Sequence, residues 1–204
     1  MTTTHFSAPT RRVCGHTDNA SFHYHSSKAR QDEERYARYS LCSDCSKQLR
    51  SAWASAPAAQ AVAESGLPDL WGGSAKQQAW ADRIRRSRQQ LVAGFHVRVV
   101  ETQDPLLELA SLTLDLMFRI QDQGFWITSE KASFHVDALK VDMELLLKGR
   151  LSPLDRTMAG SVVGYWLQAD WSVINSLARD VSDRIKPRLA GEPSVAAPAL
   201  MQTA

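Results

Sequence analysis

The sequence predicts an α+β protein that is mainly α-helical. Two segments near the N-terminus alternate large apolar and polar residues, which is typical of half-buried β-strands. The first 55 residues also contain all three cysteines and four of the six histidines, whereas the rest of the chain shows the apolar spacing of amphipathic helices. We therefore expect a small hairpin and helix module followed by a helical bundle.

The composition is that of a globular protein long enough to bury a core. The chain has 204 residues, of which 44% are hydrophobic and 23% charged, and its net charge is +2. No window approaches the roughly 20 apolar residues that a membrane span needs, and MTTTHFSAPTRRV lacks the apolar centre of a signal peptide. We expect a cytoplasmic protein with no membrane partner, in which the three cysteines are free or bound to metal.

The N-terminal module is expected to span residues 1–55. Its strands would be ASFHYH (20–25) and RYARYSL (35–41), joined by the polar run SSKARQDEE as an exposed tip. The segment SDCSKQLRSAWASA then places Cys45, Leu49 and Trp53 four residues apart, on one face of a helix.

Residues 56–73 are rich in alanine, glycine and proline, which indicates a linker with a short anchoring turn around Leu67, Leu70 and Trp71. Ser74 stands three residues before Gln77, a capping-box pattern that predicts a helix from there to about Leu91. The apolar face of this helix would carry Trp80, Ile84 and Leu91.

The helical domain is expected to run from residue 74 to residue 188. Asp104 followed by Pro105 predicts a helix start, and the leucine-rich segment after it suits the centre of the core. The segment FWI is left open between strand and turn. The next helix should end at Gly149, one broken or two consecutive helices should follow from Ser152, and residues 189–204 should be a disordered tail.

The cysteines have the spacing of a structural zinc site. Cys42 and Cys45 form a Cys-x-x-Cys pair at a helix start, and Cys14 and His16 flank a glycine that allows a tight turn. We expect zinc bound by Cys14, His16, Cys42 and Cys45 in a treble-clef-like module, with His23 or His25 as alternatives to His16. The other interpretations are that the cysteines are small buried residues or a redox pair.

Four arginines follow one another closely in the helix after the linker: Arg83, Arg85, Arg86 and Arg88. Their spacing predicts a wide cationic surface opposite Trp80 and Ile84. Arginine donates bidentately to phosphate, so these residues are the leading candidates for contact with nucleic acid. The alternative is a solvated helix face.

The segment LPDLWGGSAKQQAWADRIR resembles the motif L-P-x-L-x-G-S-x-K-Q-x-x-W-A-x-x-I-R of uncharacterised bacterial, phage and plasmid proteins that carry an N-terminal cysteine module. FWITSE matches a second family segment at Trp126 and Ile127. The resemblance implies an origin in mobile elements and an ordered unit from Trp71 to Arg85, and it transfers no activity. The first segment matches at Leu67, Pro68, Leu70, Gly73, Ser74, Lys76, Gln77, Trp80, Ala81, Ile84 and Arg85.

These observations together predict a non-enzymatic, zinc-stabilised binding protein that contacts nucleic acid or a nucleic-acid-containing complex. The alternative is a protein inhibitor of a host defence system, of the anti-CRISPR or anti-restriction type. An enzyme ranks third, because no set of nucleophile, base and oxyanion donor can be assembled from the sequence.

Overall fold

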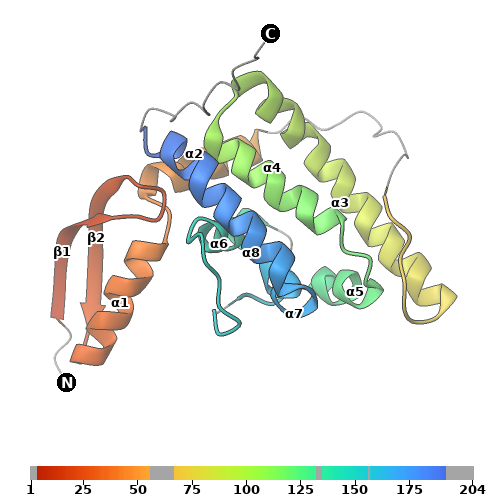
Figure 1. Ribbon diagram of the computed structural model, residues 1–204, viewed down its shortest axis with the longest axis horizontal. Coiled ribbons are helices and arrows are strands. Elements are labelled where there is room, and N and C mark those ends of the chain that lie inside the picture. The colour runs from red at the N-terminus through yellow and green to blue at the C-terminus, as the bar shows by residue number, and fades with distance from the viewer. Residues whose placement is uncertain (1–3, 56–66, 132–134, 156, 192–204) are drawn as a thin grey trace, which may run out of the picture.

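The computed structural model describes residues 4–55, 67–131, 135–155 and 157–191. The protein is mainly helical, with a two-stranded antiparallel hairpin at the N-terminus, as the sequence predicts. The hairpin and the first helix project from one end of the helical bundle (Figure 1). Within the described residues, no helix is both long and apolar enough to cross a membrane.

The hairpin consists of β1 (Thr4–Arg11) and β2 (Thr17–Tyr24). The predicted strand ASFHYH overlaps β2, but the predicted partner RYARYSL is wrong, because it lies mostly in helix α1 (Ser27–Tyr39). The polar run expected as the hairpin tip is the first part of the same helix. The strand that pairs with β2 is β1, to which the sequence analysis assigned no structure.

Local interactions explain why this segment is helical. The side chain of Ser26 accepts a hydrogen bond from the backbone of Ala29, which caps the helix. Ion pairs at helical spacing join Arg30 to Glu34 and Arg35 to Asp32. The helix packs on one face of the hairpin, so the opposite face of the two strands is left exposed.

Helix α2 (Ser43–Ala54) confirms the helix expected after the cysteine pair. It packs against α4 (Pro105–Phe118) and α6 (Val136–Leu146), and Leu49 is fully buried there. The buried cysteines belong to the same apolar cluster as the core of the bundle. The expected metal module and the helical bundle therefore share one core.

Helix α3 (Ala75–Thr102) begins at the predicted capping box of Ser74 and Gln77. It is longer than predicted, because it continues past Leu91 until Gln103 adopts a left-handed conformation with φ 51°. Ile84 is buried as expected, but Trp80 is 37% exposed. The side chain of Leu91 lies outside the described residues.

Helix α4 starts at the predicted cap, where Asp104 accepts a hydrogen bond from the backbone of Leu106. It packs against α2, α3, α6, α7 (Val162–Ala169) and α9 (Lys186–Leu189), and most of its leucines are buried. The leucine-rich segment is therefore central to the core, as predicted. The segment FWI lies in helix α5 (Gln123–Lys131), where Trp126 is fully buried.

The C-terminal third contains α6, α7, α8 (Trp171–Asp180) and a π-helical turn (Val181–Ile185) that leads into α9. Gly149 has φ 73° beyond the end of α6, as a predicted helix end requires, although the capping residue is Leu147. The prediction that a helix restarts at Ser152 is wrong, because residues 152–155 form a turn and α7 begins after Ser161. Most of the expected tail lies outside the described residues.

Candidate metal centre

The structure brings the four predicted ligands together. One donor atom from each of Cys14, His16, Cys42 and Cys45 can be chosen so that all four lie within 4.8 Å of one another. Cys14 and His16 come from the turn between β1 and β2, whereas Cys42 and Cys45 come from the start of α2. All three cysteines are free and buried, so the cluster could hold a metal ion.

Backbone hydrogen bonds and a glycine turn position both halves of the cluster. The backbone N–H of Arg12 donates to the carbonyl of His16 at 2.8 Å, and Gly15 closes the turn with φ 89°, a conformation that favours glycine. On the other side, the backbone N–H of Cys45 donates to Sγ of Cys42 at 3.3 Å. The N–H of Cys42 donates across the cluster to Sγ of Cys14 at 3.4 Å.

The distances between donor atoms suit tetrahedral zinc. Nδ1 of His16 lies 3.6 Å from Sγ of Cys42 and 3.4 Å from Sγ of Cys45. Zinc bonds of usual length at a tetrahedral angle place a sulfur and a nitrogen donor about 3.6 Å apart. A shell of three thiolates and one imidazole is also the donor chemistry of structural zinc sites.

The thiols form an electrostatically coupled group. A hydrogen bond from the Cys45 thiol lowers the pKa of Cys14 to about 4, against the opposing effect of burial, and the backbone N–H groups of Cys42 and His16 add to this. The interaction with Cys14, together with burial, raises the pKa of Cys45, and burial raises the pKa of Cys42. Cys14 is therefore the preferred thiolate, and a divalent cation would stabilise the other two.

Arg12 and Asp18 brace the two halves of the cluster from outside. Arg12 forms an ion pair with Asp18 and donates to the carbonyl of Ala37 at 2.9 Å and to Oγ of Ser40 at 2.8 Å. Asp18 accepts a hydrogen bond at 2.8 Å from the backbone of Ser43, the first residue of α2. This network ties the turn that carries Cys14 to the helix that carries Cys45.

Two contacts from distant parts of the chain complete the surroundings. The backbone N–H of Leu41 donates at 2.7 Å to Glu144 of α6, which also pairs with Lys140 at 3.2 Å. Burial raises the pKa of Glu144. On the other side, a Cβ added at Gly15 would lie 2.5 Å from the Cβ of Ala190. The sequence analysis missed both contacts, because neither residue is near the cysteines in the sequence.

The histidines considered as alternatives do not belong to the cluster. His23 lies on the exposed face of β2, directly opposite His5 of β1, and His25 is exposed just beyond the strand. His16 is therefore the histidine that the fold places with the three cysteines.

The arginines expected to form one cationic surface separate into two pairs. Arg83 and Arg86 are exposed, but only 4% of Arg85 and 7% of Arg88 is exposed. Arg85 donates to the carbonyl of Pro68 and pairs with Asp82 at 2.7 Å. The prediction of one wide cationic surface is therefore wrong, because the segment that begins at residue 67 covers one side of α3.

The other side of α3 is covered by α5. The guanidinium of Arg88 donates from Nη1 to Oγ of Ser129 at 2.7 Å and from Nη2 to the Ser129 carbonyl at 2.5 Å. It also lies 5.8 Å from the ring centroid of Trp126. Arg88 thus joins two helices inside the protein and is not available as a surface contact.

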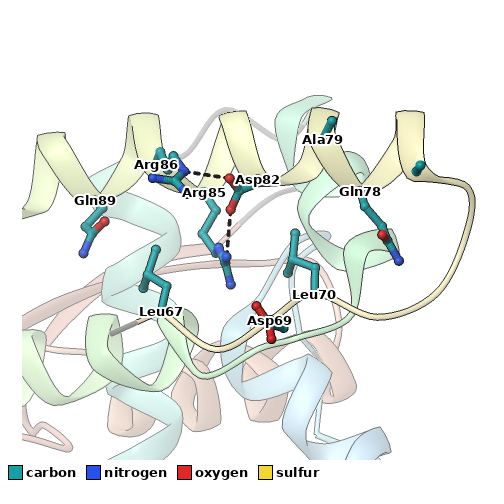
Figure 2. A pocket seen from close by; sticks show the side chains of 10 residues that line it. Leu67, Asp69, Leu70, Gln78, Ala79, Asp82, Arg85, Arg86 and Gln89 are labelled. Carbon is teal, nitrogen blue, oxygen red and sulfur yellow. Dashed lines mark hydrogen bonds and ion pairs between the residues drawn. The ribbon is translucent and has the colours of Figure 1, made fainter. Parts of the chain in front are cut away.

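The segment LPDLWGG lies along α3, and the two line an open, polar pocket of about 480 Å³. Figure 2 shows Asp82 linking Arg85 and Arg86, with Leu67 and Leu70 pointing toward the helix from the facing segment. Trp71 pairs with Asp122 in an isolated parallel bridge. These interactions order the segment from Leu67 onward, whereas residues 56–66 of the expected linker lie outside the described residues.

Comparison of this chain with family models, with curated proteins and with solved structures finds no match to any of them.

Proposed function

We propose that the chain is a non-enzymatic binding protein whose fold is stabilised by zinc at Cys14, His16, Cys42 and Cys45. The observation that supports this most directly is the arrangement of three sulfurs and one imidazole nitrogen within 4.8 Å. Four protein ligands fill a tetrahedral zinc shell and leave no position for substrate or water, as in structural sites.

The surroundings of the cluster favour a structural role over a redox role. The cysteines are at most 3% exposed, so reductants and oxidants have little access to their sulfurs. The cluster also joins the hairpin turn to α2, and its near neighbours come from α6 and from Ala190. Binding energy from zinc would therefore stabilise contacts between the N-terminal hairpin and the helical bundle.

Metal analysis combined with ligand variants tests the zinc site. The purified, dialysed protein should contain about one zinc per chain, and His16→Gln and Cys45→Ser should each lose zinc and unfold at lower temperature. His25→Gln is the matched control, since this histidine is exposed and outside the cluster. Full zinc content in both ligand variants, or an unchanged unfolding temperature after chelation, would contradict the proposal.

The proposed partner is single-stranded nucleic acid, bound through a face of α3 made of Lys76, Trp80 and Arg83, here called the α3 outer face. These residues are four and three apart, so they lie on one side of the helix. All three are exposed, and Trp80 stands between the two cations. An aromatic ring that can stack on a base, flanked by charges for phosphate, is typical of single-strand binding.

Binding of labelled single-stranded DNA and RNA, measured by fluorescence anisotropy, tests the partner. Arg83→Glu and Trp80→Ala should each weaken binding about tenfold or more, and the wild-type affinity should fall steeply with salt. Arg38→Glu, an exposed arginine on α1, is the charge-matched control. Equal binding by all variants would refute the α3 outer face, and no binding together with one stoichiometric protein partner would favour a protein inhibitor.

A further inference from the structure

The exposed face of the hairpin carries a pair of histidines that do not belong to the cluster of Cys14, His16, Cys42 and Cys45. His5 and His23 occupy directly opposite positions of β1 and β2, and both are exposed. Their ring centroids lie 4.4 Å apart, with the ring planes tilted by 46°. The next pair on the same face is Ser7 and Ser21, whose hydroxyl oxygens lie 3.2 Å apart.

We propose that His5 and His23 form a second, exchangeable site for a divalent transition metal such as Ni²⁺, Cu²⁺ or Zn²⁺. Two imidazoles that bind one metal at cis or tetrahedral angles have ring centroids about 4.5–5 Å apart, given metal–nitrogen bonds of about 2.0–2.1 Å. The observed separation of 4.4 Å differs from this by a few tenths of an ångström, so small side-chain rotations bring one nitrogen of each ring to the metal.

The hairpin holds this geometry in place before metal binds. Residues directly opposite in an antiparallel pair have Cβ atoms about 5 Å apart, and the paired backbone keeps this spacing. The rest of the hairpin packs on α1 through its other face, where Phe6 stacks on Phe22. The fold therefore sets the backbone positions and the spacing of the two histidines.

The chemistry of the face selects the metal. Imidazole is a borderline ligand that suits nickel, copper and zinc, whereas magnesium and calcium prefer carboxylate oxygens. Within the described residues, the exposed face of the hairpin carries no carboxylate. Its members are His5, Ser7, Pro9, Arg11, Thr17, Asn19, Ser21 and His23.

This site is separate from the Cys14 cluster. The pair His5–His23 and the pair Arg11–Thr17, next to the turn that carries Cys14, stand six residues apart along β1. At the usual rise of a strand this is about 20 Å. Two protein ligands on an exposed face leave the remaining positions to water, so the metal here should exchange readily, unlike zinc in a closed four-ligand shell.

A nickel titration of zinc-loaded, tag-free protein tests the proposal. Nickel is chosen as the probe because Ni²⁺ does not oxidise the thiols of the Cys14 cluster. Isothermal titration calorimetry should detect one site, and His5→Gln and His23→Gln should each weaken it about tenfold or more, since the second ligand binds as an intramolecular one. His135→Gln, an exposed histidine that caps α6, is the matched control and should bind nickel like the wild type.

A second readout locates the metal. Ni²⁺ should broaden the backbone NMR signals of Ser7 and Ser21 before those of α2, and lowering the pH should release it because protons compete for imidazole. Equal nickel affinity in the wild type and both hairpin variants, or no nickel binding by the wild type, would overturn the proposal. Zinc content at the Cys14 cluster is measured separately, so failure of one site leaves the other judged on its own result.

Discussion

Replacing Arg88 by methionine tests whether this residue stabilises the fold from inside. Methionine keeps much of the apolar stem and removes the two hydrogen bonds to Ser129 and the contact with the Trp126 ring. Hydrogen bonds from charged groups contribute about 1.5–3 kcal/mol each. The burial that lowers the pKa of Arg88 offsets part of this gain. We expect a net loss of about 2–4 kcal/mol, because an acceptor on buried Ser129 is left without its charged donor.

Urea denaturation of the purified protein, followed by circular dichroism, measures this loss. Thermal unfolding gives a second measure of the same loss. For a chain of this size each kcal/mol of lost stability corresponds to about 2–4 °C, so the melting temperature should fall by roughly 10 °C. Arg83→Met is the matched control, because its side chain is exposed and the change should stay within about 0.5 kcal/mol. If Arg88→Met unfolds at the same urea concentration as Arg83→Met, the assignment of Arg88 to the interior is refuted.

Two further changes probe other parts of the structure. Burial raises the pKa of Asp142 to about 6 from 3.8, so the folded state holds an extra proton between these values. The free energy of unfolding should therefore fall by about 2 kcal/mol as the pH rises from 4 to 7, relative to Asp142→Asn, and parallel pH profiles in urea denaturation would exclude this. Gly15→Ala should destabilise the protein by about 2–3 kcal/mol, since it combines a left-handed backbone with an overlap at Ala190. The double variant Gly15→Ala with Ala190→Gly should recover only the part due to overlap in thermal unfolding, and no recovery would argue against this contact.

The features that the sequence predicted correctly depend on short-range chemistry. The caps at Ser74 and Asp104 lie within three residues of the groups they bind, so their patterns can be read directly. The Cys-x-x-Cys pair at a helix start and the Cys-Gly-His turn are equally local. The sequence could therefore name both halves of the Cys/His cluster and the starts of α2, α3 and α4.

The predicted second strand failed because its pattern was ambiguous. Over seven residues, RYARYSL alternates as a strand does, but the Arg30–Glu34 pair and the cap at Ser26 stabilise a helix that starts earlier. Only packing resolves such a conflict: α1 buries Ala37 against the hairpin while Tyr36 is 68% exposed. The alternation of large residues does not reveal which of them faces the core.

By itself, the sequence determined the residue types of the Cys/His cluster, the helix caps and the mainly helical class, because these depend on neighbours in the chain. The tertiary structure decided which histidine joins the cysteines, and it placed Arg85 and Arg88 inside while Arg83 stays outside. It also brought Glu144 to Leu41, which lies 103 residues away in the sequence, and Ala190 to Gly15. Such contacts follow from the packing of whole helices around a common core, which no local pattern encodes.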